Sequence, residues 1–446
     1  MSVLSIRALW AVVLADGRQV LMNKRAGSIG ILGIVAVIVA AIVLAVTAPK
    51  FPVADTPAVP DDAAVPPESA MTDASALTPF YRIGRTVEGV PGTMLREQAV
   101  EDAPSDVEMS RIMYVSEDVN GNRIPVSGLY VTPGGEEPEG GWPLVAYSHG
   151  TTGSTRICGI SQTPLQQNTP GYYAWSLQIK PLVEQGWAVV ATDYEDMGAP
   201  GTPMYLIGKT QGQNVLDSVR AIQRTKTNVN PTKTAVWGHS EGGLGAYATG
   251  QIAPTYAPEV PIDGIVSVAP GIVPALPFAL NAIVKDPEPS GQTSFVMQIV
   301  RSWVAQFPDQ LDEDALTTEL GRTVGFDAIE SSCGSSIKAA LDQPMGAYIS
   351  EPLPNSIYPL LVENTVPETD LTIPSLLIQG MKDEAILPTA NIAYFNLLCN
   401  AGVPAELAVW KNDSHNGVVI SARETMDDWV ADRFAGKPAG NDCPNQ

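Results

Sequence analysis

The stretch "KTAVWGHSEGGLGAYATG" at residues 233–250 is the most informative part of the sequence, because its character changes at its midpoint. The first half is a short apolar run, which is typical of a buried strand. The second half consists of small residues, which are typical of a helix packed closely on its neighbours. Between them lie His239 and Ser240, in a chain with only three histidines. Ser240 is therefore either a nucleophile or a small polar residue in a tight turn.

Strand-like and helix-like segments alternate on both sides of this stretch from about residue 110 onward. "RIMYVSEDVNGNRIPVSGLYVTP" (111–133) predicts a hairpin that turns at residues 120–122. Further buried strands are predicted at 142–150, 187–195, 262–270, 375–380 and 405–412, and helices at 172–186, 212–226, 241–253, 388–402 and 417–436. Buried apolar strands that alternate with helices predict an α/β fold with a mostly parallel sheet covered on both faces.

Residues 271–370 interrupt this alternation. Amphipathic segments such as "TSFVMQIVRSWVAQF" (293–307) are separated there by many prolines, which predicts a helical insertion. Ligands of open α/β sheets bind at the carboxyl ends of the strands, where an insertion at this point would lie. We therefore interpret residues 271–370 as a cap, or lid, over the site. The alternative is a small helical subdomain whose apolar residues only fill its own core.

The N-terminal part differs from the rest of the chain. A basic flank precedes an uncharged apolar run at 26–48, which has the length of a helix that spans a hydrocarbon core. We expect a signal peptide or a signal-anchor helix, with residues 1–25 in the cytoplasm, rather than a buried core helix. Met22 offers a second start, and Pro49 disfavours cleavage at the bond before it. Cleavage and anchoring both stay open.

Residues 49–78 are rich in Pro, Ala and Asp and predict an extended linker, which leaves 79–446 as the folded catalytic domain. On this interpretation that domain is secreted or membrane-anchored and lies outside the cytoplasm. The sequence predicts that the protein inserts into a membrane only through its N-terminal helix. The 26 basic and 48 acidic residues give a net charge of −22, which argues against nucleic acid as a partner.

The chain has four cysteines, at positions 158, 333, 399 and 443. In an oxidising compartment they are consistent with two structural disulfides, for which three pairings exist. The sequence contains no Cys-x-x-Cys motif and no Cys/His cluster, which argues against a zinc site.

The sequence "GHSEG" fits Gly-x-Ser-x-Gly and lies after a predicted strand and before a predicted helix, where this motif functions. A nucleophile at such a sharp turn has a strained backbone, which only small neighbours permit. Gly238, Gly242 and Gly243 supply that space. The start of the helix also favours a developing oxyanion. These flanks indicate that Ser240 is the nucleophile.

A nucleophilic serine needs a base, and in this architecture the chain order is serine, acid, histidine. His415, in the loop "WKNDSHNG", is the only histidine after Ser240. Asp383, three residues beyond Gly380 at the end of a predicted strand, is our candidate for the acid that holds the histidine tautomer. Glu384 is the alternative acid. A surface histidine and a solvated acidic pair are the alternatives without catalysis.

Two backbone N–H groups are expected to stabilise the oxyanion. One belongs to Glu241, which follows the nucleophile, and the other lies in the loop "HGTTG" (149–153) after the first parallel strand. Thr151 is our candidate for the second donor, and Thr152 is its alternative.

In that order, "YSHGTTG", "ATDYEDMGAPG", "GHSEGG", "GMKDEAILP" and "NDSHNG" resemble the secretory lipase family of α/β-hydrolases, from about residue 80 to the C-terminus. The resemblance implies an α/β-hydrolase fold with a cap over an acyl pocket. It also implies hydrolysis of acylglycerol esters and no cofactor. Two disulfides, Cys158–Cys333 and Cys399–Cys443, follow from the same resemblance. His239 and Glu241 depart from the smaller or aromatic neighbours expected beside the serine.

The predicted function is therefore hydrolysis of lipid-like acyl esters by a Ser240–Asp383–His415 triad, with an acyl ester or lipid as substrate and a lipid interface as a candidate partner. The same triad also serves peptidases and acyltransferases, and an acyltransferase of the cell envelope or an esterase for non-glyceride acyl esters is the main alternative. A binding protein that retains the triad without catalysis is the second alternative.

Overall fold

The computed structural model describes residues 53–59, 77–201, 204–272, 280, 283–368 and 370–444. The predicted cytoplasmic segment (1–25) and the apolar run (26–48) lie outside these residues. Within the described part, no helix has both the length and the apolar character needed to cross a membrane.

Ten strands of the described residues form one sheet, in the order β1-β10-β9-β8-β7-β5-β6-β4-β3-β2. Strands β5 to β10 run parallel to one another, and β2, β3 and β4 are antiparallel to their neighbours. The predicted α/β class with a mostly parallel sheet is thereby confirmed. The strands are β1 (Val53–Ala54), β2 (Met94–Ala99), β3 (Val107–Glu117), β4 (Arg123–Pro133), β5 (Trp142–Ser148), β6 (Ala188–Thr192), β7 (Val229–His239), β8 (Gly264–Val268), β9 (Ser375–Gly380) and β10 (Ala405–Trp410).

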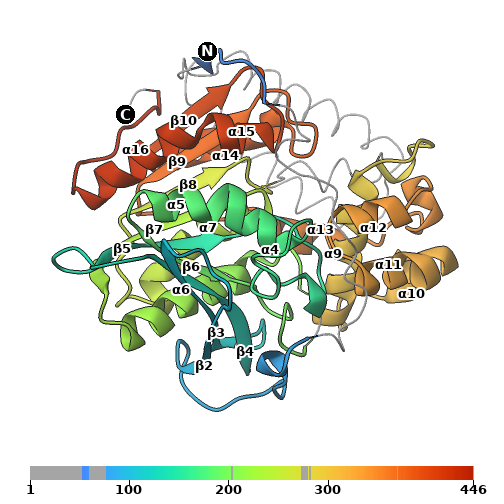
Figure 1. Cartoon of the computed structure of the whole chain (residues 1–446). Helices are drawn as coiled ribbons and strands as arrows, with labels where there is room; N and C mark the ends of the chain where they lie inside the picture. Colours follow the sequence, from blue (N-terminus) through green and yellow to red (C-terminus); the bar gives the residue numbers. More distant parts are fainter. Residues whose placement is uncertain are drawn as a thin grey trace. The chain divides into compact units, whose positions relative to one another are not determined.

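Helices cover both faces of the sheet (Figure 1). Because successive side chains of a strand point to opposite faces, Leu144 and Ala146 of β5 contribute to one apolar core, and Val145 and Tyr147 contribute to the other. Helices α6, α7 and α14 pack on the first core, and α5, α15 and α16 pack on the second. These helices are α4 (Pro170–Tyr173), α5 (Lys180–Glu184), α6 (Gly208–Thr225), α7 (Glu241–Tyr256), α14 (Pro388–Ala401), α15 (Gly417–Ser421) and α16 (Arg423–Phe434).

The helix predicted at 172–186 is interrupted in its middle by a π-helical turn, Ala174–Ile179. Pro181 follows this turn and has no N–H to donate to the preceding turn. The carbonyl of Leu177 instead accepts a hydrogen bond from the Arg423 guanidinium of α16 at 3.0 Å. Because Pro181 lacks an N–H, the Leu177 carbonyl is hydrogen-bonded to a side chain of α16 rather than to its own helix.

The insertion between β8 and β9 is helical, and it packs on the loops at the carboxyl ends of the strands. In α9, the Trp303 indole donates to the Tyr205 carbonyl at 2.8 Å, and Gln292 donates to the Ala385 carbonyl at 3.2 Å. The boundaries of the cap stay a prediction. Among the described residues of the insertion, the helices are α9 (Gln292–Gln306), α10 (Glu313–Leu316), α11 (Phe326–Ser331), α12 (Ser335–Ala340) and α13 (Ile357–Thr365), with a π turn at Gly321–Gly325 and a 3-10 turn at Met345–Ala347. Two more 3-10 turns, Pro79–Tyr81 and Arg156–Cys158, precede α4.

Two disulfides tie distant parts of the chain together. Cys158, in the loop after β5, is bonded to Cys333 of the insertion, and Cys399 of α14 is bonded to Cys443 near the C-terminus. This is the pairing that the family resemblance implies.

Part of the predicted linker lies on the edge of the sheet. Val53 and Ala54 form β1, which pairs parallel with β10. The Val59 N–H donates to the Asp413 carboxylate at 3.1 Å. Residues 53–59 thus contact the loop that follows β10 and carries His415.

Candidate active site

Ser240 lies at a sharp turn between β7 and α7. Its φ of 58° and ψ of −121° are strained for a residue with a side chain. The turn brings backbones so close that a Cβ on Gly238 would overlap the Gly242 backbone, and a Cβ on Gly242 would overlap the Ser148 carbonyl. The glycines of "GHSEGG" are therefore required by close backbone approach, as the motif predicts.

The structure brings Ser240, His415 and Asp383 together. The Ser240 hydroxyl lies 2.8 Å from His415 Nε2, and His415 Nδ1 lies 2.7 Å from Asp383 Oδ2. The serine comes from the end of β7, the aspartate from the loop after β9, and the histidine from the loop after β10. Glu384, the alternative acid, is exposed to solvent.

Asp383 is held by its own network of hydrogen bonds. Oδ1 accepts from the backbone N–H groups of Ala385 (2.9 Å) and Ile386 (2.8 Å), and Oδ2 also accepts from the Gln379 side chain (3.0 Å). Burial by itself would raise the pKa of Asp383, but the hydrogen bond and charge of His415, with help from Ile386 and Gln379, lower it below its ordinary value. Asp383 is thus an ionised acceptor at neutral pH, which favours one tautomer of His415.

The other two histidines are neutral and form hydrogen bonds with backbone carbonyls near the site. His239 Nε2 donates to the His415 carbonyl at 3.0 Å, and burial lowers the pKa of His239 to about 3. His149 Nδ1 donates to the Gly150 carbonyl at 2.7 Å, and burial lowers the pKa of His149 to about 4. His239 therefore contacts the loop of His415 without a charge that would compete with it.

The loop after β5 passes beside the serine. A Cβ on Gly150 would lie 3.6 Å from the Ser240 Cβ. The Thr151 hydroxyl is 2.9 Å from the Tyr205 hydroxyl, whereas the Thr152 hydroxyl donates to the Cys158 carbonyl at 2.9 Å. Glu241 is the first residue of α7, where a backbone N–H has no acceptor within the helix. The oxyanion roles of Glu241 and Thr151 stay a prediction.

The Glu241 side chain is buried, with 1% of its surface exposed. Its Oε1 accepts a hydrogen bond from the Gln211 amide of α6 at 2.7 Å. Burial raises the pKa of Glu241 to about 8, although Thr151, the Leu206 backbone and Gln211 act to lower it. A carboxyl beside the nucleophile is therefore neutral at pH 7.

Sequence reasoning did not identify Gln211 and Gln379, whose side chains donate hydrogen bonds to the carboxyl groups of Glu241 and Asp383. Gln211 lies on the buried side of an amphipathic helix, and Gln379 lies inside an apolar strand, where its amide is in turn bonded to Asn391 at 2.7 Å. For Gln379 the available signal was a polar residue within a strand predicted to be buried, whereas Gln211 lies just before the helix predicted at 212–226 and gave no signal. The partner of Gln379 could not be read from its signal.

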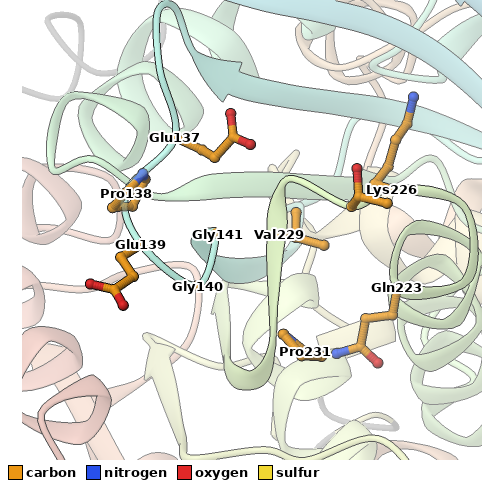
Figure 2. Close-up of a pocket in the computed structure, with 10 residues that line it drawn as sticks. Glu137, Pro138, Glu139, Gly140, Gly141, Gln223, Lys226, Val229 and Pro231 are labelled. Carbon is orange, nitrogen blue, oxygen red and sulfur yellow. The ribbon is translucent and has the colours of Figure 1, made fainter.

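A hollow of about 590 Å³ lies at the amino ends of β5 and β7. Figure 2 shows the residues that line it. Ser240, Asp383 and His415 follow the carboxyl ends of their strands, so the hollow and the triad lie at opposite ends of the strands. The hollow is lined by Glu137, Pro138, Glu139, Gly140, Gly141, Gln223, Lys226, Thr227, Val229 and Pro231. In the described part of the chain, no group of three or more His, Cys, Asp or Glu side chains is arranged to hold a metal ion.

A serine at a strand-to-helix turn, on a mostly parallel sheet with an antiparallel edge, defines an α/β-hydrolase. Solved structures agree. Candida antarctica lipase A in its closed state has a TM-score of 0.69 and 16% identity, with 84% of this chain and 90% of that chain covered. The rice cell wall degrading esterase LipA from Xanthomonas oryzae has a TM-score of 0.59 and 17% identity, with 77% and 97% covered.

Residues 161–442, more than half of the chain, match the model of the secretory lipase family, so the chain belongs to that family. A relative from Mycobacterium tuberculosis, called a probable inactive lipase, is 25% identical over 386 residues, which cover 78% of this chain and 80% of the relative. Lipase 6 of Candida albicans is 24% identical over 382 residues, which cover 79% and 80%. Family and fold together support ester-bond hydrolysis as the class of activity.

Proposed function

We propose that the chain is a serine carboxylester hydrolase that acts on lipid-like acyl esters through Ser240, His415 and Asp383. The observation that carries the proposal is the unbroken path of two short hydrogen bonds, 2.8 Å from Ser240 to His415 and 2.7 Å from His415 to Asp383. The strained backbone of Ser240 adds to it, since strain of this kind is typical of a nucleophile at an elbow.

The reaction follows from this geometry. His415 Nε2 takes the hydroxyl proton as Ser240 Oγ bonds to the ester carbonyl carbon. His415 then gives that proton to the alcohol oxygen as the ester C–O bond breaks, which leaves an acyl-Ser240 intermediate. Water repeats both steps and releases the fatty acid. Asp383 keeps the imidazole oriented and stabilises its positive charge.

The negative charge that develops on the carbonyl oxygen needs fixed donors. The backbone N–H groups of Glu241 and Thr151 fill this role in the proposal. Each such donor is worth roughly 3–4 kcal/mol of transition-state stabilisation in comparable sites.

The substrate class rests on the family and on the surroundings of the site. The helical insertion packs over the carboxyl ends of the strands, where it acts as a cap over an acyl chain. Met381 and Leu387 flank the Asp383 loop with 41% and 62% of their surfaces exposed, and they provide apolar surface for contact with a lipid interface. A profile of activity against acyl chain length, with dissolved and with emulsified esters, tests this part. Activity that is independent of chain length and interface would contradict it.

Labelling by a fluorophosphonate probe and turnover of p-nitrophenyl acyl esters test the catalytic proposal directly. We expect both in the native protein and neither in Ser240→Ala, with a loss in kcat/KM of about 10⁴-fold or more. Ser105→Ala, at an exposed serine in the turn before β3, is the matched control and should leave both unchanged. Full activity of Ser240→Ala would eliminate the proposal.

The relative that is called a probable inactive lipase favours one second candidate, a protein that binds acyl compounds without hydrolysing them. In that case the native protein would bind fatty acids, but the probe would leave Ser240 unlabelled.

We further propose that the folded part lies outside the cytoplasm. The two disulfides and the secretory character of the family support this location. Protease accessibility of intact cells tests it, and comparison of the cell-bound and released protein distinguishes an anchor from a cleaved signal.

A further inference from the structure

Glu241 is a buried acid that the proposed mechanism uses only through its backbone. An isolated carboxylate in such a place is strongly disfavoured unless a positive charge faces it or both of its oxygens are well hydrogen-bonded. Among the described groups that act on its carboxyl, none is cationic: they are the Thr151 side chain, the Leu206 backbone and the Gln211 amide. Oε2 is buried and has no hydrogen-bond partner of ordinary geometry among the described residues.

The groups around Glu241 connect four elements. Gln211 of α6 donates to Oε1 at 2.7 Å, and Glu241 opens α7. Thr151, from the loop after β5, faces the same carboxyl and also lies 2.9 Å from the Tyr205 hydroxyl. Tyr205 is fixed in turn by the cap, because its N–H donates to the Ser302 hydroxyl of α9 at 2.8 Å.

We propose that Glu241 is a positioning residue that acts as a neutral carboxylic acid: its O–H group holds the Thr151 side chain, and thereby aims the Thr151 backbone N–H at the oxyanion. Oε1 accepts from Gln211, Oε2 carries the proton toward Thr151, and the Thr151 hydroxyl donates onward to Tyr205. The role rests on the proposed function, because it concerns the same oxyanion. This proposal gives a role to the side chain of Glu241, a residue that stands where the family resemblance leads us to expect a smaller or aromatic neighbour of the serine.

Ionisation of Glu241 would reverse this role. A carboxylate in that place has no proton to offer Thr151 and instead draws the Thr151 hydroxyl proton to itself and away from Tyr205. Its charge also disfavours the oxyanion next to it. Since burial raises the pKa of Glu241 to about 8, the change falls within an accessible pH range.

The other titratable groups that face this site stay neutral in that range. Burial and the nearby Glu241 raise the pKa values of Tyr194 and Tyr205 well above the ordinary tyrosine value. Burial lowers the pKa of His149 to about 4. Among these neighbours, Glu241 is the group that changes charge on the alkaline side of neutrality.

The test compares kcat and KM of the native protein, Glu241→Gln and Glu241→Ala on a soluble p-nitrophenyl ester from about pH 6 to pH 10, around the Glu241 pKa of about 8. The glutamine amide reproduces the neutral acid, since it accepts from Gln211 and donates to Thr151. We expect kcat of the native protein to fall as pH rises through about 8, the Glu241 pKa. We expect Glu241→Gln to keep kcat at pH 7 within about threefold and to lack this alkaline fall. Glu241→Ala should lower kcat by about 10–100-fold with little change in KM, because it loosens one oxyanion donor.

Glu319→Gln, at an exposed acid of the insertion, is the matched control and should keep the native pH profile. An alkaline fall that persists in Glu241→Gln would overturn the role of Glu241 while leaving the triad intact. Native kcat in Glu241→Ala would overturn it as well. If Glu241→Ala does not fold, the profile of Glu241→Gln still decides. A native protein without Ser240-dependent turnover would instead overturn the proposed function, and the role of Glu241 with it.

Discussion

Two buried carboxyl groups at the same edge of the sheet have opposite properties. Asp383 faces His415, two backbone N–H groups and an amide, so its pKa lies below the ordinary value. Glu241 faces an amide, a hydroxyl and the Leu206 backbone but no charged group, and burial raises its pKa to about 8. The hydrogen bond and charge of His415, which act on Asp383 and have no counterpart at Glu241, separate an ionised acceptor from a neutral donor.

Asp383→Asn tests whether the Asp383 carboxylate acts as the ionised hydrogen-bond acceptor for His415. The amide cannot stabilise the imidazolium and presents an N–H where a lone pair is required, so kcat/KM should fall by about 10⁴-fold while the fold persists. Ester turnover measures the loss, and circular dichroism verifies the fold. Glu384→Gln is the matched control and should lie within about twofold of the native value, because Glu384 is exposed. Comparable losses in both variants would contradict the assignment of Asp383.

At the scale of elements, local patterns were predictable and contacts between distant segments were not. The strand-to-helix turn at Ser240 and the β3–β4 hairpin follow from glycine spacing and apolar runs within a few residues. The contact from Gln211 to Glu241 and the pairing of β1 with β10 join segments far apart in the sequence. Such contacts depend on how the elements pack, which a single sequence does not display.

The Cys158–Cys333 disulfide connects the loop after β5 to the insertion, across a separation of 175 residues. Replacing both cysteines with serine should lower the free energy of unfolding by about 2–4 kcal/mol and broaden the acyl chain-length profile, because the cap loses its tether. Thermal unfolding and ester turnover measure the two effects. The same change at Cys399–Cys443, which joins α14 to the C-terminal residues, should lower stability and leave the profile unchanged. Equal profiles in the two variants would show that the tether does not govern the cap.

Residues 53–59 contact the loop of His415 through β1 and through the Val59–Asp413 hydrogen bond. The Asp413 backbone carbonyl in turn accepts from the Lys382 N–H at 2.9 Å, which joins the loop of His415 to that of Asp383. A chain that begins at residue 60 should therefore be less stable than one that begins at residue 50, by about 1–3 kcal/mol, and have a severalfold lower kcat. Matched thermal unfolding and ester turnover compare them. Identical values would mean that residues 53–59 are a spacer without structural effect.

At the scale of the whole molecule, the protein buries several acids whose pKa is raised because the effect of burial exceeds that of the cations and hydrogen bonds near them. Burial raises the pKa of Asp193 and that of Asp217 to about 6, and it also raises those of Glu195 and Asp196. Glu241 belongs to the same group. A carboxyl whose pKa is higher in the folded chain than in the unfolded chain binds its proton more tightly when folded. Its contribution to stability is complete below the unfolded value, near 4, and is lost as pH rises through the folded value.

The free energy of unfolding should consequently fall between about pH 5 and pH 8, with a slope of about 1.4 kcal/mol per pH unit for each extra proton that the folded chain holds. Urea unfolding across this range measures the slope. The net charge of −22 adds repulsion of the same sign, but about 1 M salt screens charges on the surface and leaves buried groups largely unaffected. The slope should therefore persist at high salt and decrease in Glu241→Gln, which stays neutral throughout. A slope that disappears in salt would assign the effect to surface repulsion, and stability that rises with pH would contradict the burial of neutral acids.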